Sequence, residues 1–179
     1  MKDQATECMN GPMKSVTIKI LGDLSNHLNT RCDSAPHRAD FLKHVACFTD
    51  KAKADAVRLC SDKHLVMMEK VSNMPKENRL GGGCCSAIAL KECVVGKITE
   101  LCSGETGDYF NDMIQEVAEE NMQIVCNEYG SLGACTSKYA GWGELQAIQD
   151  SNDVSALMSH KYKTVIPIII KMMKDAKRR

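Results

Sequence analysis

The chain has 179 residues, and its 23 basic residues balance 23 acidic ones, so the formal net charge is zero. This length is typical of one domain, and we expect residues 1–179 to form a single domain. The balanced charge argues against a nucleic-acid partner, which requires a basic surface, and we expect no transmembrane segment because no apolar run is long enough.

Helical periodicity is apparent along the first half of the chain. Apolar residues recur at helical spacing over 12–28, and Pro36 suits the first turn of a second helix. The Thr-Asp pair at 49–50 can cap a third helix, which we expect to end at the Met-Pro pair at 74–75. The three consecutive glycines at 81–83 predict a hinge-like loop.

The second half of the chain is also helical in character. Residues 84–102 are expected to form a helix that is apolar nearly all round, and residues 105–129 another. Residues 130–143 are punctuated by four glycines, and a last helix is expected over about 152–176, where Pro167 would introduce a kink. Strand alternation is not apparent, so we expect an all-α fold, a disulfide-stapled bundle of five to six helices.

The ten cysteines are an even number and run through most of the chain. In an oxidising compartment they form disulfides, whereas metal sites need close pairs such as C-x2-C, which do not occur here. We therefore predict five disulfides and an extracellular location, and spacing leaves the pairing open. Because residues 1–15 lack the apolar segment of a signal peptide, we expect a secreted protein in its mature form. The cysteines are Cys8, Cys32, Cys47, Cys60, Cys84, Cys85, Cys93, Cys102, Cys126 and Cys135.

The cysteines of the helix at 84–102 point in several directions. At about 100° per residue, Cys84 and Cys102 share one face and Cys93 lies on the opposite face. Adjacent Cys84 and Cys85 do not easily bond to each other, so we expect them to bond to two different partners. A helix that is tied on several sides is expected to lie at the centre of the domain.

Short motifs surround the cysteines between Ala39 and Tyr139. They are ACF at 46–48, RLC at 58–60, CC at 84–85, EC at 92–93, ELC at 100–102 and IVCNEYGSLGAC at 124–135. In these motifs and their spacing, the segment resembles arthropod secreted cysteine-rich proteins similar to the haemolymph 27-kDa glycoprotein family. The resemblance implies a helical protein of a body fluid or gland secretion, without an established activity. The chain has no N-x-S/T sequon, and in this respect it departs from a glycoprotein.

Motifs for catalysis and metal binding are not found in the chain. The Cys84-Cys85 pair is not followed by the His-Asp pair of secreted phospholipases A2, and GxSxG and HExxH do not occur. We therefore expect a protein that is not an enzyme and that has no catalytic residue, metal or cofactor. Carboxylates at helical spacing over 108–120 form either a weak divalent-cation site or, as we expect, a solvated helix face.

Eleven methionines accompany only three Phe and one Trp. Met is flexible and polarizable, and a core with few aromatic rings leaves space between aliphatic side chains. We therefore predict a non-catalytic protein that binds or carries an apolar small molecule or lipid between the helices at 105–129 and 152–173. The candidate lining residues are Met113, Val117, Leu157, Met158, Val165 and Ile169. The alternative is an extracellular interaction or structural component of a secretion such as silk, venom or haemolymph, which binds a protein partner and has no ligand pocket.

The C-terminal segment 161–179 combines seven basic residues with the apolar run VIPIIIKMM. A basic amphipathic helix can lie on an anionic membrane. Alternatively, its apolar face docks on the bundle while its cations favour the C-terminal end of the helix dipole. The sequence leaves both alternatives open.

Overall fold

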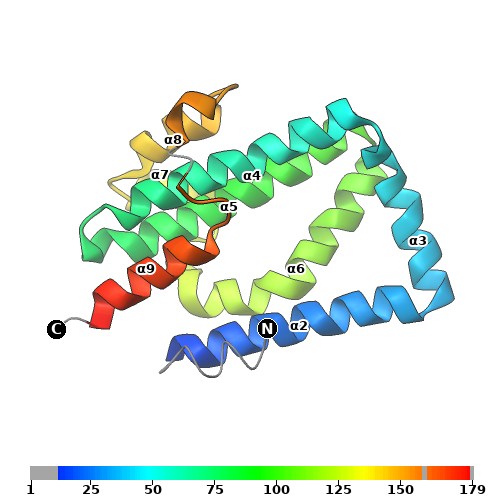
Figure 1. Cartoon of the computed structure of the whole chain (residues 1–179), viewed down its shortest axis with the longest axis horizontal. Coiled ribbons are helices and arrows are strands. Elements are labelled where there is room, and N and C mark those ends of the chain that lie inside the picture. Colours follow the sequence, from blue (N-terminus) through cyan, green and yellow to red (C-terminus); the bar gives the residue numbers. More distant parts are fainter. Residues whose placement is uncertain (1–11, 159–160, 178–179) are drawn as a thin grey trace.

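The computed structural model describes residues 12–158 and 161–177 of the chain (Figure 1). Within these ranges the backbone forms eight α-helices, three short 3-10 helices and no strand, which confirms the all-α fold. The elements are α2 (Pro12–Asp33), α3 (Ala35–Val45), η1 (Ala46–Thr49), α4 (Lys51–Ser72), α5 (Lys76–Leu101), α6 (Gly104–Cys126), η2 (Asn127–Tyr129), α7 (Leu132–Lys138), α8 (Trp142–Asp150), η3 (Ser155–Leu157) and α9 (Ile166–Lys177).

Helices α4 and α5 form a long antiparallel pair at the centre of the structure (Figure 1). On one side of the pair, α6 turns back from the end of α5, α2 packs against α6, and α3 connects α2 to the start of α4. At the opposite end, α7, α8 and α9 pack around the end of α4 and the start of α5. Because α5 contacts α4, α6, α7 and α8, it lies at the centre, as predicted.

Local signals set the ends of the two central helices. The Asp50 carboxylate caps α4 by accepting hydrogen bonds from the backbone N–H groups of Ala52 and Lys53, at 2.8 and 3.4 Å. Pro75, which has no backbone N–H group, lies between the end of α4 and the first residue of α5. Both boundaries confirm the predictions from the sequence.

Four disulfides tie α5 to its neighbours. Cys84 and Cys85 bond to different elements, as predicted, because neighbouring residues of a helix point about 100° apart. Cys93 lies on another side of α5 and bonds to α4. The pairs are Cys47–Cys102, Cys60–Cys93, Cys84–Cys126 and Cys85–Cys135, and they join α5, or the residue that follows it, to η1, α4, α6 and α7.

Cys32, in the last turn of α2, is exposed and has no disulfide partner among the described residues. The predicted set of five disulfides is therefore not complete within the described ranges. The reason is that the other eight cysteines described there already bond to one another. Cys8, the tenth cysteine, lies outside the described residues.

The three glycines at 81–83 lie inside α5, so the hinge-like loop predicted there is wrong. The missing side chains allow close packing instead of a turn. A β-carbon on Gly82 would lie 2.6 Å from the Tyr139 hydroxyl and 2.8 Å from Cγ2 of Val71. Tyr139, which is buried, therefore packs directly on the backbone of α5.

The helix predicted over 152–176 is shorter in the structure. Helix α8 ends at Asp150 and α9 starts at Ile166, and the described residues between them, 151–158 and 161–165, are irregular except for η3. Pro167 is the second residue of α9, where a missing N–H group costs no helical hydrogen bond, so it lies in the first turn instead of kinking the helix. The glycine-punctuated segment 130–143 likewise contains the short helix α7.

The main core lies where α4 and α5 meet α7 and α8. Met67 of α4, Cys85 of α5 and Leu145 of α8 are fully buried there. Trp142, at the start of α8, also packs into this core, with 5% of its surface exposed. This core fixes the position of α5, from which the candidate site is built.

Helix α9 docks on α4 through a second apolar cluster. Ile168 is fully buried and packs with Leu65 and Met68 of α4. At the edge of this contact, Lys171 donates hydrogen bonds to the side-chain oxygens of Ser72 and Asn73, at 3.2 and 2.7 Å. Of the two alternatives for the basic C-terminal segment, the structure therefore shows docking on the bundle for the described part of α9. Within the described ranges, we find no helix with the length and apolar character needed to span a bilayer.

Candidate functional site

Helices α5 and α6 form an antiparallel hairpin that is held together at both ends. Near the turn, α6 carries Gly107, and a β-carbon there would overlap Oγ1 of Thr99 on α5. At the other end, the Cys84–Cys126 disulfide brings the two Cα atoms to 5.5 Å. Between these two contacts the helices diverge, because α6 leaves the turn at an angle to α5 and bends only farther along (Figure 1).

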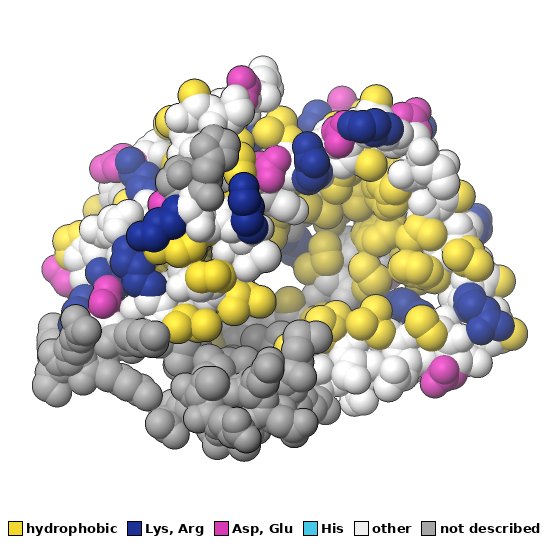
Figure 2. Space-filling view, viewed as in Figure 1, with side chains coloured by type: hydrophobic (Ala, Val, Ile, Leu, Met, Phe, Trp, Pro, Cys, Tyr) yellow, Lys and Arg dark blue, Asp and Glu magenta, His cyan; other side chains and the backbone are white. Residues whose placement is uncertain are grey.

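A cleft of about 490 Å³ lies between α5 and α6, and we call it the α5–α6 cleft. Its apolar wall consists of Ile114, Ala118 and Met122, which recur along one face of α6, together with Ile88 of α5. Cys126, one half of the disulfide, lies at its end. Figure 2 shows a hollow in the surface between α5 and α6, with apolar side chains gathered around it. The other lining residues are Lys91, Gln115, Gln123, Asn127 and Gly130.

Lys91 is the one charged side chain among the described residues that line this cleft. It is half-buried, and it makes no hydrogen bond or ion pair with another residue in the described part of the chain. The neighbouring lysine of the same helix, Lys97, differs in this respect, because its amine lies 2.7 Å from the carboxylate of Glu100. As far as the described residues show, the α5–α6 cleft thus combines an apolar wall with one lysine that has no acidic partner.

None of the six residues that were predicted to line a ligand site lines the α5–α6 cleft. Met158, Val165 and Ile169 pack in the cluster between α9 and α4. Leu157 is 54% exposed on η3. Met113 and Val117 are half-buried on α6. The fold therefore brings three of the six together in one cluster, and it does not place all six around one cavity.

Two physical reasons explain this difference. The segment predicted as one helix over 152–173 is interrupted, so its residues do not form one continuous face. On α6 the apolar face is broad, and a sequence pattern does not say which of its edges faces a neighbour. The bond at Cys126 decides this, because Ile114, Ala118 and Met122 recur at intervals of four and share the face of that cysteine. This interval of four residues, counted back from Cys126, was the signal in the sequence that identifies the cleft residues. It leads to Ile114, which directly follows the predicted residue Met113.

A second, polar cleft of about 480 Å³ lies at the corner of α2, α3 and α6. Arg31 of α2 donates hydrogen bonds to the hydroxyl of Tyr109 and the carboxylate of Glu116, both at 3.2 Å. Burial lowers the pKa of Arg31, but these two contacts outweigh it, so that the pKa lies above its usual value. Nδ1 of His27 also lies 3.1 Å from Glu116. These contacts join α2 to α6.

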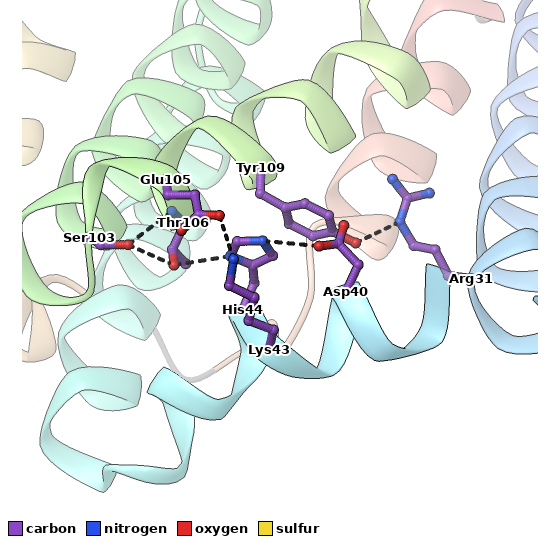
Figure 3. A network of polar contacts seen from close by, with 8 residues as sticks. All are labelled: Arg31, Asp40, Lys43, His44, Ser103, Glu105, Thr106 and Tyr109. Atoms are coloured by element: carbon purple, nitrogen blue, oxygen red, sulfur yellow. Dashed lines mark hydrogen bonds and ion pairs between the residues drawn. The ribbon is translucent and has the colours of Figure 1, made fainter. Parts of the chain in front are cut away.

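A chain of polar contacts leads from α6 to α3 (Figure 3). Ser103 donates to the hydroxyl of Thr106, which lies 3.2 Å from Nδ1 of His44, and Nε2 of His44 lies 3.6 Å from Asp40. A hydroxyl, an imidazole and a carboxylate in this order are used in nucleophilic catalysis. Here Thr106 and His44 are both buried and line neither cleft, and the His44 ring stacks on Tyr109 at 4.3 Å. The chain therefore holds α3 against the start of α6.

The carboxylates of α6 whose side chains the structure describes, at 108, 112 and 116, do not form a metal site. Glu116 contacts Arg31 and His27, and Asp112 lines the polar cleft. Among the residues that the structure describes, no three His, Cys, Asp or Glu side chains are placed so that they could hold a metal ion. This helix face is thus partly ion-paired with α2, where the sequence predicted a solvated face.

No protein-family model, curated protein or solved structure matches this chain.

Proposed function

We propose that this protein is a secreted, non-catalytic binding protein that carries an apolar small molecule or lipid in the α5–α6 cleft. The observation that carries the proposal is the row of Ile114, Ala118 and Met122 along a cleft of about 490 Å³. Small-molecule sites are typically cavities of about 300–1,000 Å³ with mostly apolar walls and a few polar groups. The α5–α6 cleft agrees with this description in size and in lining.

The two ties of the hairpin explain how a cleft can persist between two helices. Apolar atoms that line an unfilled space lose packing contacts, which destabilises the fold. The Cys84–Cys126 disulfide closes a segment with a sequence separation of 42, and a loop of this order contributes about 3–4.7 kcal/mol. Met122 adds adaptability, because its flexible side chain can follow ligands of different shape.

The proposed secretion is supported by the cysteines. Disulfides persist in oxidising compartments and are rare in the cytosol, and four of them tie the described helices. The resemblance of residues 39–139 to arthropod secreted proteins supports the same proposal. An extracellular carrier would meet its ligand in a body fluid or gland secretion.

The proposal is tested by displacement of a lipophilic fluorophore. The wild-type protein is expected to bind the fluorophore with a stoichiometry near one and to release it when candidate lipids are added. Ala118→Phe fills the cleft and is expected to weaken binding at least tenfold without loss of helicity. Ala147→Phe, at an exposed position of α8, is the matched control and is expected to leave binding unchanged.

A second candidate function is an extracellular interaction protein without a ligand pocket. It is favoured by the exposed leucines of α2 and α3, among which Leu28 and Leu42 are 54% and 56% exposed. If no lipophilic compound binds at micromolar concentrations, the carrier proposal fails. The double variant Leu28→Ser, Leu42→Ser then tests the alternative, which expects loss of association with an extracellular protein partner.

A further inference from the structure

Lys91 gives the α5–α6 cleft a positive charge, and an uncharged lipid would form no ion pair with it. Lys91 lines a cleft whose other described lining residues are apolar or uncharged, and none of them is acidic. Among the described residues this half-buried cation has no anionic partner, so no charge-assisted hydrogen bond offsets the hydration that it loses. A ligand with an anionic head group supplies that partner.

We propose that the α5–α6 cleft selects long-chain carboxylates, that is, fatty acids, and that Lys91 binds their head group. This inference rests on the proposed function and specifies its ligand class. Lys91 donates a charge-assisted hydrogen bond to the carboxylate, which is stronger than a hydrogen bond between neutral groups. Gln115 lines the same cleft, and its side-chain amide offers a second donor for the same carboxylate.

The two contacts that hold the ends of the α5–α6 hairpin together define the direction in which the ligand lies. Lys91 lies about midway along α5 between Thr99, which packs against Gly107, and Cys84, which bonds to Cys126. Ile88 and Met122 lie on the disulfide side of Lys91 in this antiparallel hairpin. The alkyl chain therefore extends from the head group towards the disulfide, along apolar side chains. On this side of Lys91, the lined face of α6 from Ala118 to Cys126 is about 12 Å long at about 1.5 Å per residue.

The experiment compares a fatty acid with the fatty alcohol of the same chain length, by displacement of the fluorophore at pH 7. The wild-type protein is expected to bind the acid at least tenfold more tightly than the alcohol. Lys91→Met is expected to weaken binding of the acid at least tenfold while binding of the alcohol stays within twofold. Lys91→Arg, which keeps the charge, is expected to retain most of the preference for the acid.

The matched control is Lys97→Met on the same helix, because Lys97 pairs with Glu100 and does not line the cleft. This variant is expected to leave the affinities for both ligands unchanged. Equal affinities of the wild-type protein for acid and alcohol would overturn the head-group inference and leave the carrier function standing. Binding of neither ligand would overturn both. The comparison of the two ligands in the wild-type protein does not depend on the folding of any variant.

Discussion

Tyr139 packs on α5 where Gly82, which has no side chain, leaves room for its ring. A β-carbon on Gly82 would lie 2.6 Å from the phenol oxygen, closer than real β-carbons approach another atom. The same hydroxyl lies 3.0 Å from Sδ of Met74, so the ring also reaches the segment between α4 and α5. Burial raises the pKa of Tyr139, which therefore stays protonated and neutral in the core.

The first prediction concerns Gly82→Ala and Gly83→Ala. Replacing glycine by alanine within a helix stabilises it by roughly 0.5–1 kcal/mol, whereas overpacking a core costs about 1–3 kcal/mol. Around Gly83 a β-carbon would meet no atom within 4 Å, so Gly83→Ala is expected to stabilise the helix without a cost from overpacking. We expect Gly82→Ala to lower the free energy of unfolding and Gly83→Ala to raise it, as measured by urea denaturation. Two increases of similar size would show that Tyr139 does not contact α5 at Gly82.

The second prediction concerns Lys63, which is 8% exposed and donates a hydrogen bond of 2.6 Å to the backbone carbonyl of Gln149 near the end of α8. Burial lowers the pKa of Lys63. Lys63→Met leaves that carbonyl without a donor, and hydrogen bonds to charged groups contribute about 1.5–3 kcal/mol. The control is Lys70→Met, which breaks an exposed ion pair with Glu144 and is expected to cost less than about 1 kcal/mol. Equal losses of thermal stability in the two variants would contradict this role of Lys63.

The third prediction concerns pH. His64 of α4 lies 2.8 Å from the hydroxyl of Ser86 on α5, and burial lowers the pKa of His64 below its usual 6.5. Below that value the unfolded chain binds a proton that the folded protein does not, so stability falls as the pH falls through and below 6.5. The slope contributed by His64 is at most about 1.4 kcal/mol per pH unit. It is expected to be lost in His64→Gln and retained in the exposed variant His37→Gln, when unfolding is measured at several pH values.

The fourth prediction separates stability from ligand binding. Alanine replacement of both Cys84 and Cys126 releases the end of the α5–α6 cleft, whereas replacement of both Cys60 and Cys93 releases α5 from α4. Each double variant is expected to lose about 3–4.7 kcal/mol of stability, since the two loops are of similar length. Only the variant that lacks Cys84 and Cys126 is expected to lose fluorophore binding at a temperature where both variants remain folded. Equal binding in the two variants would place the ligand site elsewhere.

The fifth prediction concerns the oxidation state of Cys32. We expect the number of free thiols in the denatured, unreduced protein to be close to zero, because all ten cysteines are predicted to be oxidised. Since the other described cysteines are paired, we expect Cys32 and Cys8 of the same chain to bond to each other. Peptide mapping without reduction should recover these two residues in one linked fragment. Two reactive thiols would limit the protein to the four disulfides described above.

Features that depend on neighbouring residues were predictable from the sequence. The cap at Asp50 and the break at Pro75 involve backbone groups only a few residues away, so the local pattern carries the whole signal. The different partners of Cys84 and Cys85 follow from helix geometry alone. The all-α fold follows in the same way, because helical periodicity is a property of each segment.

Features that depend on distant segments were decided by the tertiary structure. Three glycines signal a loop when they are considered locally, but at Gly82 the deciding contact comes from Tyr139, far along the chain. The apolar face of α6 was visible in the sequence, yet the bond between Cys126 and Cys84 determines that Ile114 rather than Met113 lines the cleft. A pattern of residue types records which side chains avoid water, and only the packing of one helix on another determines which neighbour covers them.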